Sequence, residues 1–249
     1  MSLDGITIIK MEIQIAAAKI NKYATPESGD TLEMVERPNG GVSVVLADGQ
    51  SSGRGAKAVS TLVVRKVIAL LAEGVRDGAA ARAASDALFT EKNGKVIACL
   101  NILSVDLQSQ TIVLSRNNPS PIYIANGDQI KCIDKPSTPI GTTRNIKPEI
   151  TEIPLSPNLT IIIFTDGIYY AGDRTGERMD ICSSIQGMLE EENPGAQYLA
   201  DALLHQAIRL DQSRPNDDMS VVVLRVSAID SDQIRKMSLT LPVPLLRNS

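Results

Sequence analysis

The sequence has little of the chemistry on which many enzymes and secreted domains depend. Among 249 residues there is no Trp, aromatic residues make up 3%, and there are one His and three Cys. The cysteines, Cys99, Cys132 and Cys182, lie far apart and form no C-x-x-C pair, which argues against a disulfide framework and against a zinc site. This cysteine usage fits a reducing cytoplasm. A Ser-His-Asp triad would need His205, but a lone histidine on a predicted helix more often packs or faces solvent.

The sequence also lacks a surplus of positive charge and any long apolar run. The formal net charge is -4 and the pI is about 5.2, so nothing indicates a surface that binds polyanions. No apolar run is long enough to cross a bilayer. We therefore expect a cytoplasmic protein with no nucleic-acid or membrane partner. The 43% hydrophobic and 22% charged residues are ordinary for a soluble globular domain.

Short apolar runs and helical spacing alternate along the chain in a defined order. Three strands come first, then two helices, then a second series of strands, two more helices and a last strand. The expected strands are 11–20, 31–37, 41–48, 95–107, 111–116, 121–127, 129–134, 159–167 and 217–226, and the expected helices are 56–73, 79–91, 177–191 and 194–210. We expect one domain over residues 1–227, followed by a C-terminal tail over 228–249.

The loop after the third strand allows two incompatible interpretations. "GRGAKA", with Gly53, Gly55 and Ala58, fits a G-x-G-x-x-A dinucleotide fingerprint, whereas "LADG" places Asp48 at the end of a strand. A dinucleotide fold needs the glycines at the tight strand-to-helix turn and a parallel strand next. Here "GQSS" separates Asp48 from Gly53, and a second helix follows the first. The order of elements therefore argues against a dinucleotide.

Acidic residues recur at the ends of the predicted strands. Asp48 and Asp166 each end an apolar run and precede glycine, and Asp30 and the pair Asp217 and Asp218 stand where strands begin. If several carboxylates converge, each pair 4 Å apart repels by about 4 kcal/mol at an effective dielectric of 20, so the cluster needs cations. Oxygen ligands favour Mg²⁺ or Mn²⁺ over zinc. The other Asp-Gly pairs, at residues 4 and 77, follow no apolar run and are interpreted as plain turns.

Four motifs in this order resemble those of the metal-dependent serine/threonine protein phosphatases of type 2C. They are "SGD" (Ser28–Asp30), "LADGQSSG" (Leu46–Gly53), "IIIFTDG" (Ile161–Gly167) and "NDDMSVVVLRV" (Asn216–Val226), and the resemblance spans residues 11–227. It is strongest to the bacterial sporulation and stress-response branch, especially the stressosome feedback serine phosphatase. The resemblance implies an α+β fold, an antiparallel β-sandwich flanked by helical layers, which agrees with the order of elements above.

The resemblance also implies a site with two Mn²⁺ or Mg²⁺ ions and hydrolysis by a metal-activated water. By family role, Asp48 would bridge both ions and Gly49 would offer its carbonyl. Asp166 and Asp217 would hold one ion, and Asp30 the other, with Asp218 as the substitute for Asp217. Asp48 and Asp166 are the residues to which we assign catalysis. The implied substrate is phosphoserine or phosphothreonine on a regulatory protein, either a scaffold or an antagonist of a bacterial stress complex.

The sequence departs from the broader family at several positions. Gln50 stands where many members have a histidine as candidate general acid, and an amide cannot supply a proton. No Arg lies near the first acidic motif to hold phosphate, so Arg54 and Lys57 are substitutes by position only. Asn117 replaces a usual glycine and Asn118 keeps the amide, which we interpret as a structural turn.

Two other functions compete with an active phosphatase. A pseudophosphatase would keep the fold and bind phosphoproteins without turnover, although a retired site need not keep a costly carboxylate cluster. A soluble scaffold whose strand-end aspartates are coincidental would bind no metal. The sequence leaves open the identity of the substrate, the general acid, the choice between Mn²⁺ and Mg²⁺, and the oligomeric state.

Overall fold

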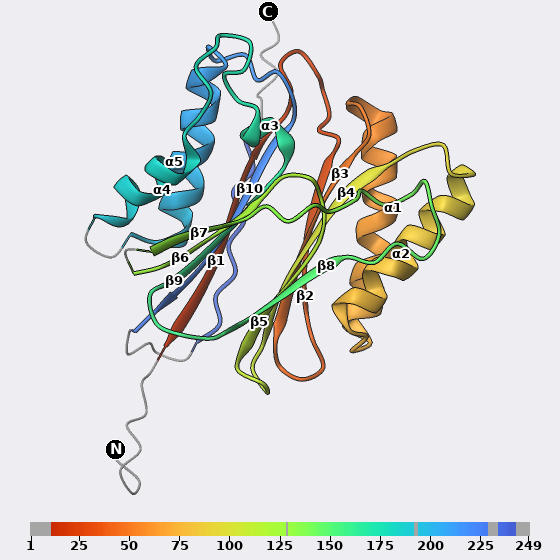
Figure 1. Cartoon of the computed structure of the whole chain (residues 1–249), viewed down its shortest axis with the longest axis horizontal. Coiled ribbons are helices and arrows are strands. Elements are labelled where there is room, and N and C mark those ends of the chain that lie inside the picture. The colour runs from red at the N-terminus through yellow and green to blue at the C-terminus, as the bar shows by residue number, and fades with distance from the viewer. Residues whose placement is uncertain (1–10, 128, 192–193, 229–233, 243–249) are drawn as a thin grey trace, which may run out of the picture.

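The chain folds into two antiparallel β-sheets that face each other, with helices on both outer faces (Figure 1). This computed structural model describes residues 11–127, 129–191, 194–228 and 234–242. The start of the predicted domain, residues 1–10 with the expected turn at Asp4, lies outside the described residues, as do residues 229–233 and 243–249 of the predicted tail. The arrangement confirms the α+β antiparallel sandwich with helical layers.

Each sheet has five strands. The first sheet has the order β1 (Glu12–Ile20), β10 (Met219–Ser227), β9 (Leu159–Phe164), β6 (Ile122–Asn126) and β7 (Gln129–Ile133). The second has the order β2 (Asp30–Glu36), β3 (Val42–Gly49), β4 (Ala98–Asp106), β5 (Thr111–Asn117) and β8 (Glu149–Pro154). The inner faces enclose a core of aliphatic side chains such as Leu46, Leu103, Ile161 and Leu224. The sandwich therefore holds the two sheets in a fixed relation.

Helices α1 (Gly53–Ala72) and α2 (Asp77–Lys92) cover the outer face of the second sheet (Figure 1). In α1, Val59, Val63, Val67 and Leu71 recur every four residues and are buried against this sheet and α2, as expected for one apolar face of a helix. The expected turn at Asp77 is wrong. Asp77 is the buried first residue of α2 and forms an ion pair with Arg37, which suits a carboxylate at a helix N-terminus.

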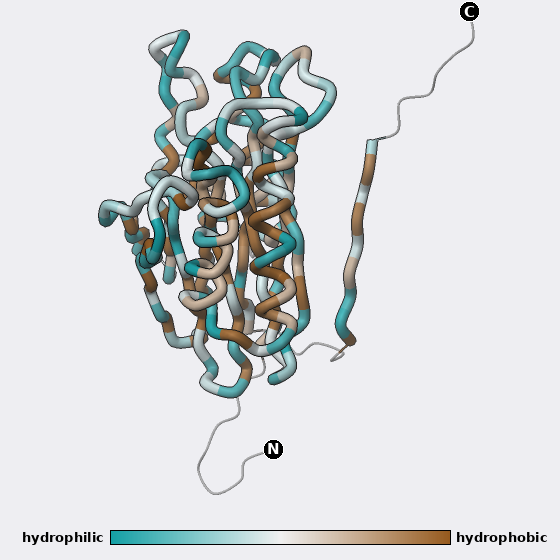
Figure 2. Tube along the Cα trace, turned by 90° about the vertical axis from the view of Figure 1, so that its right-hand side faces the viewer, coloured by the Kyte–Doolittle hydropathy of each residue, from teal (hydrophilic) through white to brown (hydrophobic). Residues whose placement is uncertain are grey.

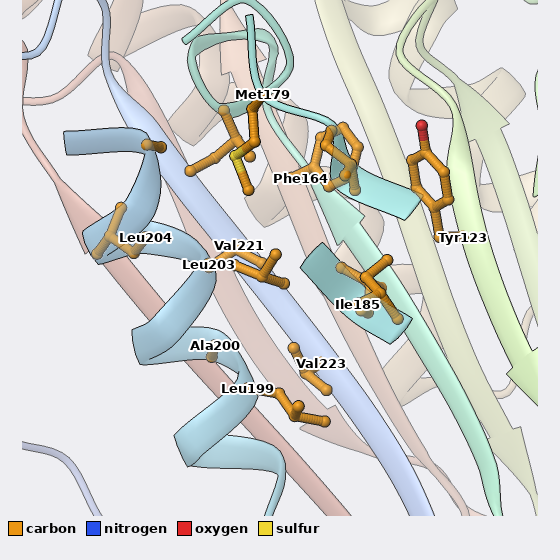
Figure 3. Close-up of a cluster of buried hydrophobic side chains, with 14 of the residues drawn as sticks. Tyr123, Phe164, Met179, Ile185, Leu199, Ala200, Leu203, Leu204, Val221 and Val223 are labelled. Atoms are coloured by element: carbon orange, nitrogen blue, oxygen red, sulfur yellow. The ribbon is translucent and has the colours of Figure 1, made fainter. Parts of the chain in front are cut away.

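The outer face of the first sheet carries α4 (Ile181–Leu189) and α5 (Ala196–Leu210). Figure 3 shows Leu199 and Leu203 of α5 among the side chains that pack on Val221 and Val223 of β10. The helix expected from residue 177 begins only at Ile181, because the carboxylate of Asp180 accepts a hydrogen bond from the Ser183 amide at 3.1 Å and caps the first turn. His205 lies exposed on α5.

After Ser227 the described residues have no helix or strand, and Figure 2 shows residues 234–242 as an extended segment at one side of the sandwich. Arg235 ties the start of this segment to Glu36 at the end of β2, at 3.0 Å. In the part of the chain that the structure describes, no helix combines the length and the apolar character that a membrane span requires.

Candidate metal centre

Strands from both sheets bring the predicted aspartates to one end of the sandwich. Asp30 opens β2 and is paired in register with Asp48 near the end of β3. In the other sheet, the end of β9 is paired with the start of β10, with Phe164 opposite Val221. The short helix α3 (Asp166–Tyr169) follows β9 directly, and Asp217 and Asp218 directly precede β10. Antiparallel pairing thus places carboxylates that are far apart in sequence at the same edge.

Asp48 carries the largest electrostatic perturbation of these carboxylates. Burial, followed by the negative charges of Asp30, Asp166, Asp217 and Asp218, raises the pKa of Asp48 to about 9. Nearby negative charges make it harder for a carboxyl group to ionise. Asp48 therefore lies in the negative field of the other four carboxylates. The four other aspartates therefore lie near enough to Asp48 to act on it electrostatically.

Asp30 is fully buried and only one of its carboxylate oxygens is hydrogen-bonded. Its Oδ2 accepts from Ser220 Oγ at 2.6 Å and from Thr165 Oγ1 at 3.0 Å, whereas Oδ1 has no hydrogen-bond partner among the described residues. Burial raises the pKa of Asp30 to about 6, and the two hydroxyl hydrogen bonds oppose that rise. A buried carboxylate oxygen without a partner is costly. An oxygen of this kind can serve as a ligand for a hard cation.

The two aspartates before β10 have different surroundings. Both carboxylate oxygens of Asp218 accept hydrogen bonds from backbone amides. Oδ1 accepts from the amide of Lys22 at 2.9 Å, and Oδ2 accepts from the amide of Gly29 at 2.8 Å. Asp217 is partly exposed, and its Oδ1 accepts from the amide of Asp218 at 2.9 Å. Asp217 therefore keeps an oxygen for a cation. Asp218, named above as its substitute, instead fixes the loop that leads to Asp30.

Asp166, at the start of α3, also belongs to this charged group. Burial and then the neighbouring carboxylate of Asp217 raise the pKa of Asp166, while the amide of Gly167 lowers it. The carboxylate of Asp217 thus acts on Asp166 across the ends of β9 and β10. Sharing one cation would relieve their repulsion.

The glycines after Asp48 and Asp166 are required by close packing of the backbone. A Cβ at Gly49 would lie 2.1 Å from the carbonyl oxygen of Ala56, and a Cβ at Gly167 would lie 2.2 Å from that of Asp218. Neither glycine has a positive φ. These Asp-Gly pairs are therefore close approaches of two backbone segments, which hold the carboxylates in place.

The positions that depart from the broader family have structural contacts. The side-chain carbonyl of Gln50 accepts from the backbone amide of Ile97 at 3.0 Å, and the backbone amide of Gln50 donates to the Ile97 carbonyl at 3.1 Å. Lys57 donates to the carbonyl of Asp30 at 2.8 Å, so its ammonium group supports β2. Arg54 is exposed in the first turn of α1. The side-chain amide of Asn118 donates to Phe164 O at 3.4 Å, next to the strand end that precedes Asp166.

The donor set fits a hard divalent cation. It consists of carboxylates, one of them with an unpartnered buried oxygen. Within the described ranges, no three acidic, thiol or imidazole groups already surround a single point as metal ligands do. Binding would thus draw these carboxylates closer than their mutual repulsion alone permits.

Comparison with known proteins identifies the family. The sequence model of the family "Stage II sporulation protein E (SpoIIE)" matches residues 38–227. The chain belongs to the SpoIIE family. Stage II sporulation protein E of Bacillus subtilis is 25% identical over 216 residues, which cover 86% of this chain and 26% of that protein. This SpoIIE-family chain therefore spans about a quarter of the length of that relative.

Solved structures agree on the fold of the SpoIIE-family chain. The type 2C phosphatase domain of SpoIIE from Bacillus subtilis, with a fragment of its regulatory domain, gives a TM-score of 0.76 at 24% identity, covering 87% of this chain and 64% of that one. The catalytic domain of the serine/threonine protein phosphatase PstP, in complex with two manganese ions, gives 0.66 at 18% identity, covering 88% and 100%. The assignment to the type 2C serine/threonine phosphatase domain family is confirmed, while the narrower likeness to a stressosome feedback phosphatase stays a prediction.

Sequence reasoning missed four residues that surround the aspartates. Thr165 and Ser220 contact Asp30, Lys19 donates to the Asp30 carbonyl at 3.1 Å, and Cys99 is paired in register with Asp48. Thr165 precedes Asp166 and Ser220 follows Asp218 by two positions, so proximity to the acidic motifs was the available signal. Lys19 and Cys99 carry no such signal in the sequence.

Proposed function

We propose that the chain is an active metal-dependent phosphatase that hydrolyses phosphoserine or phosphothreonine on a regulatory protein. The observation that carries this proposal is the set of carboxylates that the paired strand ends bring to one edge of the sandwich. Burial, and then the charges of Asp30, Asp166, Asp217 and Asp218, raise the pKa of Asp48 there to about 9. A group of buried and partly buried carboxylates that repel one another is costly for a fold unless a cation neutralises it. The family and its fold supply the reaction class.

Asp48, Asp166, Asp217 and Asp30 are the residues that would hold two Mn²⁺ or Mg²⁺ ions, with the carbonyl of Gly49 as a further ligand. Asp48 is the one whose pKa responds to all the others, which suits a residue shared by both ions. When bound, such ions activate a water molecule for attack on phosphorus and offset charge on the phosphoryl oxygens.

The chain's own residues arrange this chemistry. Asp218 holds the loop before β2 through Lys22 and Gly29, and the tight contact of Gly49 with Ala56 fixes the end of β3 against α1. Gln50 contacts the backbone of Ile97 through its side-chain carbonyl and its own backbone amide, and a carboxamide is too weak an acid to protonate a leaving group, so we assign it no acid role. These residues thus position the carboxylates.

We propose that the substrate is a cytoplasmic phosphoprotein, a scaffold or antagonist of a bacterial stress complex. The resemblance to bacterial signalling phosphatases supports this assignment, and three free cysteines among the described residues suit a reducing compartment. With 3% aromatic residues and no Trp, strong interface anchors are scarce and the encounter with a protein partner should be brief.

A comparison of substrates tests this function. We expect kcat/KM for a phosphorylated regulator in Mn²⁺ to exceed that for a small aryl phosphate, because the aryl ester lacks the remote contacts that stabilise the transition state. Asp48→Asn should abolish turnover. Asp106→Asn, at the opposite end of β3 and β4, is the matched control and should leave turnover unchanged.

Other outcomes would select other functions. Preference for the aryl phosphate would indicate a metabolite phosphatase on the same fold. Tight binding of the phosphoprotein with no turnover, in Mn²⁺ and in Mg²⁺, would indicate a pseudophosphatase. Turnover that survives Asp48→Asn would show that the site is elsewhere.

A further inference from the structure

Two hydroxyl groups from the first sheet meet one carboxylate oxygen of the second sheet. Ser220 Oγ on β10 lies 2.6 Å from Asp30 Oδ2, and Thr165 Oγ1, just after β9, lies 3.0 Å from the same atom. All three residues are buried, with exposed fractions of 0% to 1%. These contacts connect the two sheets at the edge where the aspartates gather.

The backbone sets the direction of the Thr165 hydrogen bond. The amide of Ser220 donates to Thr165 Oγ1 at 3.0 Å, so that the threonine oxygen is already an acceptor and its own proton is available for Asp30. The contacts from Thr165 Oγ1 to the carbonyls of Asp218 and Ser220 are longer, at 3.4 and 3.5 Å. Asp30 Oδ2 therefore receives two donors, and hydrogen bonds to an ionised oxygen are the stronger kind.

The rest of Asp30 is held as firmly. Its amide donates to Ser28 Oγ at 3.1 Å, and its carbonyl accepts from Lys57 at 2.8 Å and from Lys19 at 3.1 Å. Oδ1 alone among its polar atoms has no hydrogen-bond partner in the described part of the chain. The surroundings thus use every other polar atom of this residue.

We propose that Thr165 and Ser220 are positioning residues that occupy one oxygen of Asp30 so that the other, Oδ1, is offered to a divalent cation. A carboxylate with one oxygen held by two donors cannot rotate freely, so less conformational freedom is lost when the cation binds. When residues that orient a metal ligand in this way are removed, metal affinity commonly falls roughly 10- to 100-fold. We expect an effect of this order for Thr165 and Ser220. This inference rests on the proposed function, and it adds two residues to which no role was given above.

Metal binding measured without substrate tests the role. Isothermal titration of the full chain with Mn²⁺ should show a dissociation constant raised roughly 10- to 100-fold by Ser220→Ala and by Thr165→Val. Thr165→Ser keeps the hydroxyl and should bind Mn²⁺ more tightly than Thr165→Val, close to the wild type. Ser104→Ala is the matched control, because Ser104 is a buried strand serine whose hydroxyl lies 2.6 Å from that of Ser43, toward the other end of the sandwich. It should bind Mn²⁺ like the wild type.

Melting temperatures in EDTA separate positioning from loss of stability. If Ser220→Ala and Ser104→Ala lower the melting temperature alike but only Ser220→Ala weakens Mn²⁺ binding, the positioning role holds. Unchanged Mn²⁺ affinity in both Ser220→Ala and Thr165→Val, with binding by the wild type, would overturn this inference and leave the proposed function intact. Absence of Mn²⁺ binding by the wild type would overturn both.

Discussion

Replacing Asp48 by Asn should stabilise the metal-free protein while destroying its site. The pKa of Asp48 is about 9 in the folded chain and has an ordinary value of 3.8. Because the folded state holds this proton more tightly, the unfolded state binds fewer protons between these two values, and stability falls as pH rises from about 4 to about 9. Asparagine does not titrate, so the variant lacks this loss.

The size of the effect follows from the pH and the pKa of the unfolded chain. A pH of 7 lies 3.2 units above the ordinary pKa of 3.8. At about 1.36 kcal/mol for each unit, the upper bound on the stability that the wild type loses is about 4 kcal/mol. Asp48 is partly exposed and shares the proton with its neighbours, so we expect about half, roughly 2 kcal/mol. For a chain of this size that corresponds to a rise in melting temperature of about 4 to 8 °C.

Thermal unfolding in EDTA between pH 5 and pH 9 measures this difference. The melting temperature of Asp48→Asn should exceed that of the wild type, and the gap should widen as pH rises. Asp106→Asn should follow the wild type, because Asp106 caps an exposed turn through the amides of Gln108 and Ser109, and Asn can still accept these bonds. A variant less stable than the wild type at pH 8, or a gap that does not change with pH, would refute the electrostatic reasoning.

Three further outcomes test the metal, the backbone contact and the core. Saturating Mn²⁺ should stabilise the wild type by about 2.7 kcal/mol at 100 times the dissociation constant, and an unchanged melting temperature would contradict a metal site. Gly49→Ala should cost about 3 kcal/mol or more, because its Cβ would meet the Ala56 carbonyl at 2.1 Å; a wild-type urea midpoint would argue against that contact. Leu203→Ala should cost about 2 to 5 kcal/mol in urea unfolding yet leave turnover of the folded fraction unchanged.

Regular patterning made most of the strands and the main helices predictable. The helical spacing of Val59, Val63 and Val67 and the alternation along β2 are local properties, so they can be detected without knowledge of the fold. β8 was missed because Glu149–Pro154 is a short edge strand that is half exposed and ends in proline. The helix α3 was missed because its four residues are too few for a periodic signal.

The candidate site also has a part that local sequence patterns predict and a part that depends on how the sheets pack. Asp48 and Asp166 could be proposed from the sequence because each follows an apolar run and precedes glycine, a pattern local to the chain. The hydrogen bonds from Thr165 and Ser220 to Asp30 depend on how two sheets pack, across separations of 135 and 190 residues, which no local pattern encodes. The same holds for Asp218. Its contacts with the amides of Lys22 and Gly29 fix a loop, and they depend on the folded structure rather than on a local pattern.

The number of Mn²⁺ ions bound per chain tests the central claim most directly. Equilibrium dialysis of the wild type against Mn²⁺, followed by metal analysis, should give two ions per chain at saturation. Asp48→Asn should give fewer than two, because the residue shared by both ions has lost its charge, and Asp106→Asn should again give two. A folded wild type that retains no Mn²⁺ and no Mg²⁺, or an Asp48→Asn variant that still binds two ions, would contradict a two-ion phosphatase centre built on these carboxylates.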